Sequence, residues 1–326
     1  MNDCSLTVNG RAVRFGDGIS SRGTISLSFG YICTKHRHMK KTALSLILTF
    51  LTIGLFAQNR ETSSGDYGFP KVPSIENLQH PWQGKKVAIL GDSISDPRLG
   101  RISGNKLYWS YLQDWLQLEI YNYAVSGMQW NDIPRQVSQL EKEHSDDVDA
   151  ILILMGTNDY NMGIPPGEWF TETEEWVLAG TDMRTPATQQ LRKRRSLVMD
   201  NSTVRGRINI AMKMIKEKYP RCAIVLMTPL HRGNFIASEG NVQPEESYQN
   251  RIGEYLDAYV EAVREAGGVW SVDVVDLYSV SNMNPIYGQS FYYGGENDLL
   301  HPGPEGSRHL ATVLYYRLLS IAVKDL

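Results

Sequence analysis

The chain has 326 residues and a formal net charge of −3. Removing the 7 Lys and Arg and the 2 Asp and Glu of residues 1–57 leaves 26 basic against 34 acidic residues, a net charge of −8. So acidic a chain argues against nucleic acid or an anionic membrane as the main partner. Only Cys222 of the three cysteines lies after residue 57, which excludes an intrachain disulfide there, and its place in the run CAIVLM predicts a buried thiol.

Residues 39–57 have the order of a secretory signal peptide. Met39 is followed by two lysines, an apolar stretch and a small residue, Ala57. A membrane anchor is the alternative, but the stretch of about 15 apolar residues is shorter than the roughly 20 that span hydrocarbon. We therefore expect a secreted or periplasmic protein, cleaved near Ala57 and without a stable membrane anchor. Residues 1–38 are interpreted as an upstream extension outside the fold.

After a lead-in at residues 58–84, residues 85–326 are predicted to form one domain. Apolar runs of strand length, bounded by Gly, Pro, Asn or Asp, recur at Val87–Leu90, Ile120–Val125, Ala150–Met155, Ala223–Thr228 and Val269–Leu277. Apolar residues have helical spacing in Tyr108–Leu118, in Ile208–Tyr219 and from Leu310 to Ile321. This alternation predicts an α/β fold, a three-layer α/β/α sandwich around a mainly parallel five-stranded sheet.

Two segments lack this alternation. Residues 160–201 contain Trp169, Phe170 and Trp176 and include the basic cluster RKRR at 192–195. Residues 278–297 form an aromatic-rich segment just before the sequence DLLHP. Connections of this length are usually lids, binding loops or small subdomains.

The sequence GDSI places a serine at the carboxyl end of the first predicted strand. Chemistry in α/β proteins gathers at the carboxyl ends of parallel strands, so Ser93 is the candidate nucleophile. Its partners would be an imidazole that takes the proton and a carboxylate that orients the imidazole. His301 follows Asp298 by three residues, and a tight turn would bring that carboxylate to Nδ1 and leave Nε2 facing Ser93. The alternative is an ordinary loop before the last helix.

Gly127 and Asn158 stand just beyond the second and third predicted strands. The backbone N–H groups of Gly127 and Ser93 and the side-chain amide of Asn158 are candidate donors to a developing negative oxygen. Each position also has an ordinary interpretation, as a turn glycine or as a polar residue that satisfies its own loop.

In this order along the chain, the motifs resemble those of the SGNH hydrolases, also called GDSL esterases and lipases. The matching blocks are Gly91-Asp92-Ser93-Ile94, Ser126-Gly127, Gly156-Thr157-Asn158-Asp159 and Asp298-Leu299-Leu300-His301. The resemblance implies a flavodoxin-like fold, a catalytic triad of Ser93, His301 and Asp298, and no cofactor. It also implies an oxyanion hole made by Ser93, Gly127 and Asn158. The Gly-x-Ser-x-Gly elbow of α/β-hydrolases is absent around Ser93.

Other polar residues receive simpler interpretations. Asp92 and Asp96 flank the serine, but no cluster of histidines or carboxylates accompanies them, so turn and strand-end roles are favoured over a metal site. His231 follows the fourth strand and should border the cleft, as a substrate contact or as a plain loop residue. The RKRR cluster is interpreted as a solvated face, and His309, inside the last helix, is not expected to be catalytic.

The leading hypothesis is a secreted serine esterase that removes acyl groups from carbohydrate through an acyl-enzyme intermediate. Acetyl is the expected acyl group. Because aromatic faces pack against sugar rings, both irregular segments are predicted to rim the cleft. His231, Trp169, Trp176 and Tyr292 are the predicted substrate contacts. A lipase, lysophospholipase or thioesterase of the same family is the first alternative, although aliphatic residues suited to a long acyl chain are sparse in residues 278–297. A non-catalytic carbohydrate-binding protein is the second.

Overall fold

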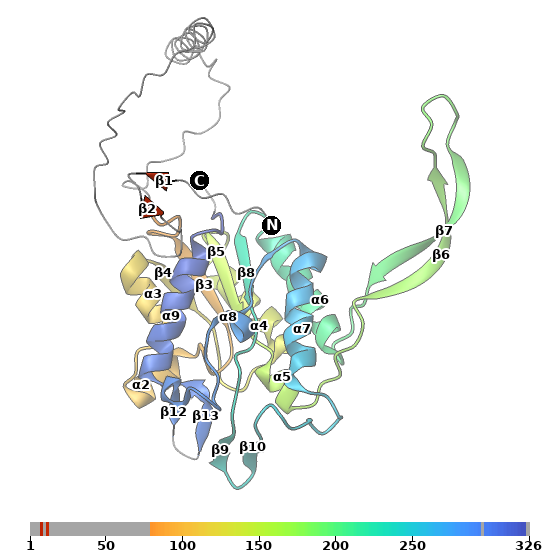
Figure 1. Ribbon diagram of the computed structural model, residues 1–326. Helices are drawn as coiled ribbons and strands as arrows, with labels where there is room; N and C mark the ends of the chain where they lie inside the picture. Colours follow the sequence, from red (N-terminus) through yellow and green to blue (C-terminus); the bar gives the residue numbers. More distant parts are fainter. Residues whose placement is uncertain (1–6, 9–10, 13–78, 295–296, 324–326) are drawn as a thin grey trace, which may run out of the picture. The chain divides into compact units, whose positions relative to one another are not determined.

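The computed structural model describes residues 7–8, 11–12, 79–294 and 297–323 (Figure 1). The predicted signal peptide, its cleavage site and most of the upstream extension lie outside these residues. The chain divides into two compact units, Met1–Val72 and Pro73–Leu326. In the first unit, β1 (Thr7–Val8) and β2 (Arg11–Ala12) form a short antiparallel pair.

The second unit is built around a parallel sheet of five strands in the order β11-β8-β5-β3-β4. Its strands are β3 (Lys86–Gly91), β4 (Glu119–Asn122), β5 (Ala150–Leu154), β8 (Ala223–Met227) and β11 (Asp273–Val275). All four neighbouring pairs are parallel. Counted along the chain the order is 2-1-3-4-5, which is the flavodoxin-like arrangement. The predicted α/β fold is therefore confirmed.

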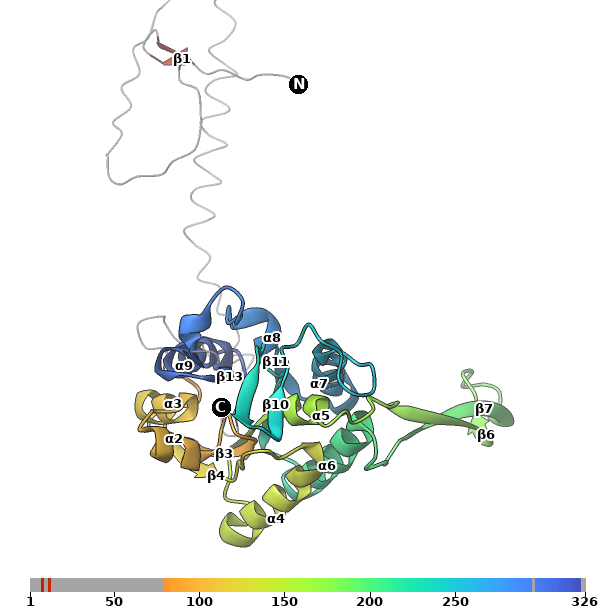
Figure 2. The same cartoon turned by 90° about the horizontal axis from the view of Figure 1, so that it is seen from below.

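Different helices cover the two faces of this sheet (Figures 1 and 2). Helices α4 (Ile133–His144), α6 (Val204–Lys218) and α7 (Leu256–Trp270) cover one face, and α3 (Tyr108–Leu116) and α9 (Pro304–Leu318) cover the other. Along β3 the side chains alternate between the two faces of the sheet. Ala88 and Leu90 pack in the core under α4, α6 and α7, and Val87 and Ile89 pack in the core under α3 and α9. All four are fully buried, which explains why this strand is a continuous apolar run.

The fifth strand starts later than predicted. Val269 and Trp270 are the last residues of α7, and β11 begins only at Asp273. Ser271 ends the helix in a left-handed conformation, with φ of 51°, and its N–H bonds the carbonyl of Gly267. Periodicity alone cannot divide an apolar run shared by a helix end and the following strand.

A four-stranded antiparallel sheet, which was not predicted, has the order β10-β9-β13-β12. Its strands are β9 (Phe235–Ser238), β10 (Asn241–Gln243), β12 (Tyr292–Gly294) and β13 (Asp298–Pro302). They are grouped at the bottom of Figure 1. The short elements α2 (Pro97–Ser103), η2 (Trp130–Asp132), α5 (Thr157–Asn161), α8 (Leu277–Val280) and η3 (Gln289–Phe291) complete the unit. No helix of the described part of the chain is long and apolar enough to cross a membrane.

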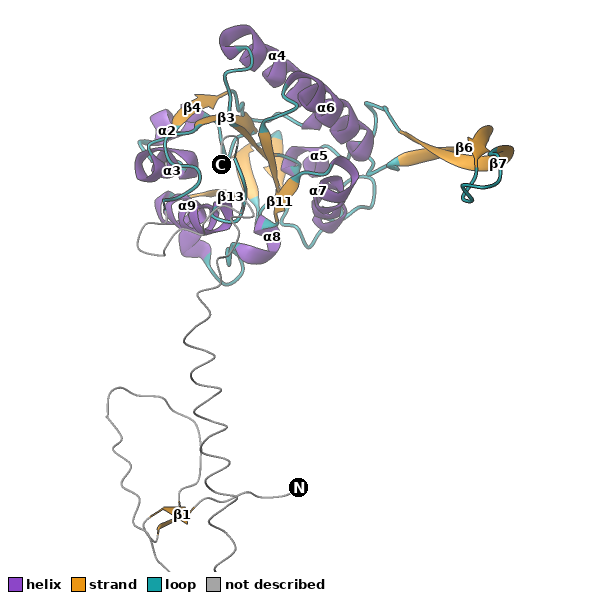
Figure 3. Ribbon diagram, turned by 90° about the horizontal axis from the view of Figure 1, so that it is seen from above, coloured by secondary structure: helices purple, strands orange, loops and turns teal. Residues whose placement is uncertain are grey.

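Residues 160–201 form a projecting hairpin, not a rim around the predicted cleft. Its strands β6 (Phe170–Ala179) and β7 (Thr188–Leu197) make an antiparallel sheet of their own. Figures 1, 2 and 3 show the hairpin extending from the α6 and α7 side of the domain, away from β12 and β13. The RKRR cluster lies on β7, and Lys193, Arg194 and Arg195 form ion pairs with glutamates of β6. This agrees with a solvated charged face.

Trp169 anchors the base of the hairpin in the core, which corrects its predicted role as a substrate contact. The side chain is only 9% exposed. Its Nε1 donates to Oε2 of Glu265 on α7 at 2.7 Å, and its carbonyl accepts the N–H of Val198 at 2.9 Å. Burying so large an aromatic ring against two helices stabilises the fold.

We predict that Trp169→Ala lowers the free energy of unfolding by about 3 to 5 kcal/mol, because the large cavity left behind cannot collapse fully. Trp176→Ala, at a site 69% exposed on the same hairpin, should change it by less than about 0.5 kcal/mol. Urea denaturation of both variants measures the difference. Equal effects would mean that Trp169 does not anchor the hairpin.

Candidate active site

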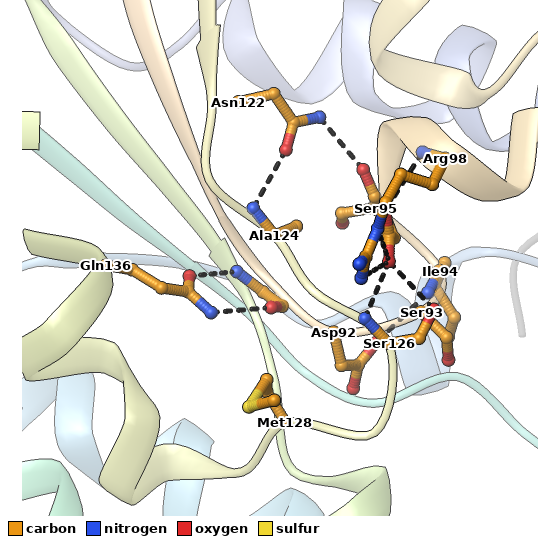
Figure 4. Close-up of polar contacts among 12 residues, drawn as sticks. Asp92, Ser93, Ile94, Ser95, Arg98, Asn122, Ala124, Ser126, Met128 and Gln136 are labelled. Carbon is orange, nitrogen blue, oxygen red and sulfur yellow. Dashed lines mark hydrogen bonds and ion pairs between the residues drawn. The ribbon is translucent and has the colours of Figure 1, made fainter. Parts of the chain in front are cut away.

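The end of β3 presents Ser93 at the point where the strand order of the parallel sheet reverses. β3 lies between β4 and β5. A Cβ on Gly91 would lie 2.7 Å from the carbonyl oxygen of Leu154, so only glycine lets β3 and β5 approach this closely. The side-chain amide of Gln136 on α4 then bonds both the N–H and the carbonyl of Gly91, each at 2.9 Å (Figure 4). The backbone that leads to Ser93 is thus held from both sides.

Ser93, His301 and Asp298 form a continuous chain of hydrogen bonds. The Oγ of Ser93 lies 2.9 Å from Nε2 of His301. On the other side of the ring, Nδ1 lies 3.0 Å from Oδ2 and 3.1 Å from Oδ1 of Asp298. Ser93 and His301 are both buried. With Nδ1–H donating to the carboxylate, Nε2 is the acceptor for the serine hydroxyl.

The antiparallel sheet holds the imidazole and its carboxylate. Asp298 and His301 both lie on β13, and Oδ1 of Asp298 accepts the backbone N–H groups of Leu300 at 3.1 Å and His301 at 2.9 Å. The ring of Phe235 on β9 meets the His301 ring edge to face, with 4.9 Å between the ring centroids. The three-residue spacing therefore lets one carboxylate bind both the backbone and the ring of His301.

Asp96 fixes the loop that contains Gly127. Its Oδ2 accepts the backbone N–H of Ser126 at 2.7 Å and the Ser126 hydroxyl at 2.9 Å (Figure 4). Burial would raise the pKa of Asp96, but the hydrogen bonds from Arg98 and Ser126 outweigh it and lower the pKa to about 2. The next residue, Gly127, has φ of +79°, a conformation that favours glycine.

Asn158 and Asp159 join this loop to the end of β5. The Nδ2 of Asn158 donates to the carbonyl of Met128 at 3.0 Å, and an amide nitrogen carries a second N–H. The two carboxylate oxygens of Asp159 accept the N–H of Trp130 at 3.1 Å and Nη1 of Arg207 at 2.9 Å. Burial raises the pKa of Asp159 to about 6 against the pull of Arg207. The loop of Gly127 and the first turn of α5 are therefore one bonded unit.

Two further predicted substrate contacts, Tyr292 and Trp176, are not placed to touch a substrate. Tyr292 is 3% exposed, and its hydroxyl donates to the carbonyl of His231 at 2.8 Å, so it supports the loop after β8 from inside. Trp176 lies on the projecting hairpin, away from the sheet that contains His301. Neither therefore rims the cleft, which corrects the prediction.

His231 remains a candidate at the edge of the site. Its Nδ1 lies 2.6 Å from Oε1 of Glu246, and its ring packs on Tyr278 with 3.6 Å between the centroids. The half-buried ring fits both alternatives left open by the sequence. His309 on α9 instead has Nε2 2.6 Å from the carbonyl of Ser281, far from a catalytic geometry.

Sequence analysis missed Arg232 and Phe235. Arg232 is almost fully buried and donates from Nη1 to Oγ1 of Thr157 at 3.2 Å and from Nη2 to Oε1 of Gln243 at 2.8 Å. Burial lowers its pKa to about 10. A single arginine or phenylalanine outside a recognisable motif has no sequence pattern that marks it as part of a site. Within the described residues, no group of three or more His, Cys, Asp or Glu side chains is placed to hold a metal ion.

Comparison with known proteins agrees with this geometry. The family model of the GDSL-like lipase/acylhydrolases matches residues 89–309. The chain belongs to this family. Its members are ester hydrolases, so the enzyme class predicted from the sequence is confirmed. No curated protein matches the chain.

Several solved structures are similar to this family member. A protein from Lactobacillus plantarum is 21% identical with a TM-score of 0.52, over 72% of this chain and 97% of that one. A possible lipase from Chitinophaga pinensis is 22% identical with a TM-score of 0.52, over the same shares of the two chains. An acetyl xylan esterase from Geobacillus stearothermophilus is 16% identical, over 75% of this chain and 98% of that one, and its TM-score of 0.44 is too low to bear on substrate. At these identities the likeness shows the fold alone.

The aspartate of the GDS motif is a buried acid next to Ser93 in the chain. Asp92 is 1% exposed, and its Oδ1 accepts the N–H of Ile94 at 3.1 Å. Burial, together with the nearby charge of Asp159, raises the pKa of Asp92 to about 7, while His301 and Arg232 oppose the rise. The carboxyl group is therefore partly protonated at neutral pH in the folded enzyme.

This shift predicts a pH-dependent stability. An unfolded aspartate titrates near about 3.9, whereas folded Asp92 titrates at about 7. Between these values the folded state binds the extra proton, so the free energy of unfolding falls as pH rises from about 4 to about 7, by at most about 1.4 kcal/mol per pH unit. Asp92→Asn removes this contribution. Urea denaturation at several pH values should show wild type losing stability relative to Asp92→Asn across that window and no further above it. Parallel curves would contradict the assignment.

Proposed function

We propose that this GDSL-family member hydrolyses esters through Ser93 as nucleophile, His301 as general base and acid, and Asp298 as the group that orients the imidazole. The observation that carries the proposal is the unbroken geometry of 2.9 Å from Ser93 Oγ to His301 Nε2 and 3.0 Å from Nδ1 to Asp298. Within the described residues, no other histidine ring is hydrogen-bonded to a serine or threonine hydroxyl.

The reaction follows from these positions. As Ser93 Oγ bonds to the carbonyl carbon, its proton passes to His301 Nε2, and Asp298 stabilises the imidazolium. The N–H groups of Ser93 and Gly127 and the amide of Asn158 stabilise the negative oxygen. The bond between carbon and the alcohol oxygen then breaks, and the alcohol leaves with the proton from Nε2. Water attacks the acyl-Ser93 ester by the same route and releases the acid.

We predict that Ser93→Ala lowers kcat by about 10⁴ to 10⁶-fold while the fold persists, by comparison with serine proteases. His301→Ala should be nearly as damaging, and Asp298→Ala less so, because the imidazole can still take a proton. His309→Ala is the matched control and should change kcat/KM only slightly. Turnover of p-nitrophenyl acetate and circular dichroism of each variant test this. An active Ser93→Ala enzyme, or an essential His309, would refute the triad.

We further propose that the enzyme removes a short acyl group, with acetyl as the expected one, and that the alcohol part of the ester is a saccharide. Polar groups follow two strands of the parallel sheet: Asn158 comes after β5, and His231 and Arg232 come after β8. On β12, which pairs with the strand of His301, Tyr292 points inward, whereas Tyr293 on the opposite face is 37% exposed. Tyr293 thus offers the aromatic face for a sugar ring that Trp169 and Trp176 do not. Export of the enzyme to such a substrate is also a proposal, and it rests on residues 39–57 alone.

We expect p-nitrophenyl acetate to be a better substrate than p-nitrophenyl palmitate, with kcat/KM at least about tenfold higher, because added methylenes gain about 0.8 kcal/mol each only where an apolar wall receives them. Tyr293→Ala should raise KM for an acetylated oligosaccharide and leave KM for p-nitrophenyl acetate unchanged. Tyr316→Ala, an exposed tyrosine near the end of α9, is the control. Preference for palmitate would favour a lipase, and saccharide binding without turnover would favour a binding protein.

A further inference from the structure

The hairpin of β6 and β7 leaves two long strands without a covering layer. Each strand has ten residues, and within the described residues the two pair only with each other. Figures 1 and 3 show the ribbon projecting from the domain beyond its base. An isolated two-stranded hairpin is marginally stable in water and normally needs a third strand or a packed face. A partner surface would supply such a packed face.

One face of this hairpin has an ordered pattern. Cross-strand partners share a face, so the register gives this face five pairs from base to tip: Phe170 with Leu197, Glu172 with Arg195, Glu174 with Lys193, Trp176 with Leu191, and Leu178 with Gln189. We call it the Trp176 face. Near the tip it exposes Trp176 by 69%, Leu178 by 62% and Leu191 by 51%. Below that apolar cluster, acids lie only on β6 and bases only on β7.

We propose that the Trp176 face binds the same face of a second copy of this chain. If the two ribbons lie face to face and parallel, related by a two-fold axis along the ribbon, β6 of one copy lies over β7 of the other. Glu172 and Glu174 then face Lys193 and Arg195 of the partner, and the Trp176 cluster faces Leu191 across the axis. Charge and apolar surface are both complementary in this arrangement, as an isologous contact requires.

Other self-associations are opposed by charge. Pairing β6 edge to edge with its own copy would bring glutamates together, and pairing β7 with its copy would bring together the bases at 192–195. An antiparallel face-to-face arrangement would place β6 over β6 and would move the apolar tip onto the charged middle. The parallel two-fold arrangement avoids both conflicts.

The size of the face sets the expected affinity. A ribbon with ten-residue strands is about 33 Å long and about 10 Å wide. That is a small contact beside the roughly 800 Å² that each partner buries in a standard complex. The dimer is therefore weak, with a Kd in the micromolar range or above. Formation of this dimer does not depend on ester hydrolysis, because the hairpin projects away from the domain that contains Ser93.

Sedimentation velocity of the purified protein, from about 1 μM to about 500 μM, should show a monomer and dimer in exchange. Leu191→Glu should weaken the dimer at least about 100-fold, since it buries an unpaired charge near the axis. Val177→Glu is the matched control, because Val177 on β6 is exposed on the opposite face of the same hairpin, and it should keep the dimer. Both variants should retain wild-type turnover of p-nitrophenyl acetate, which separates this test from that of the triad.

A charge exchange tests whether the charges of the two copies face each other in the dimer. Lys193→Glu with Arg195→Glu makes the face wholly acidic, and Glu172→Lys with Glu174→Lys makes it wholly basic. Each double variant alone should stay monomeric, and an equal mixture should form a heterodimer that high salt dissociates. A protein monomeric at every concentration, open-ended oligomers, or equal loss in Leu191→Glu and Val177→Glu would each overturn the proposal. Binding of a soluble glycan through Trp176 by a strictly monomeric protein would assign the face to substrate instead.

Discussion

The parallel pairing of β3 with both β4 and β5 is the constraint from which the site follows. Ile89 of β3 is in register with Asn122 of β4, and Gly91 is in register with Leu154 of β5. The loops that follow the three strands must therefore leave the sheet at one edge. Ser93, Gly127 and Asn158 come together because their strands are neighbours, although the chain separates them by whole helices. Asp96 of the first loop and Asn158 of the third then bond the second loop, at Ser126 and Met128.

Four aspartates near the serine have different roles because their partners differ. Asp298 faces an imidazole, and Asp96 binds Ser126 and Arg98 and stays ionised to a pKa of about 2. Asp159 is paired with Arg207, while Asp92 is buried beside Ile94 with a pKa near 7. Only Asp298 is hydrogen-bonded to the ring of His301. The other three bind backbone N–H groups and so stabilise the loops. The family motifs therefore include residues that support the site as well as residues proposed to react.

The two irregular segments serve different purposes because their anchors lie in different places. Residues 160–201 leave α5 and are secured by Trp169 against Glu265 on α7, at the flank of the domain. Beyond this anchor the hairpin projects away from the domain that contains Ser93. Residues 278–297 must instead arrive at Asp298, and β12 pairs with β13 on the way. The proposed substrate contacts therefore come from the second segment, because only it leads into the strand of His301, and the first segment presents a surface of its own.

The α/β class, most of the strands and the three residues of the proposed triad could be predicted from the sequence, because apolar runs that end in small polar residues reflect local rules of burial and strand termination. It also marked the hairpin segment as an exception, through its length. The folded structure was needed to show that Trp169 is core, that Tyr292 supports a loop and that Trp176 lies on the projecting hairpin. The reason is physical: an aromatic residue has the same local signature whether it is packed against helices, buried beneath a loop or exposed to solvent. Which of these occurs depends on contacts such as that of Trp169 with Glu265, 96 residues away along the chain, and no local pattern encodes such a contact.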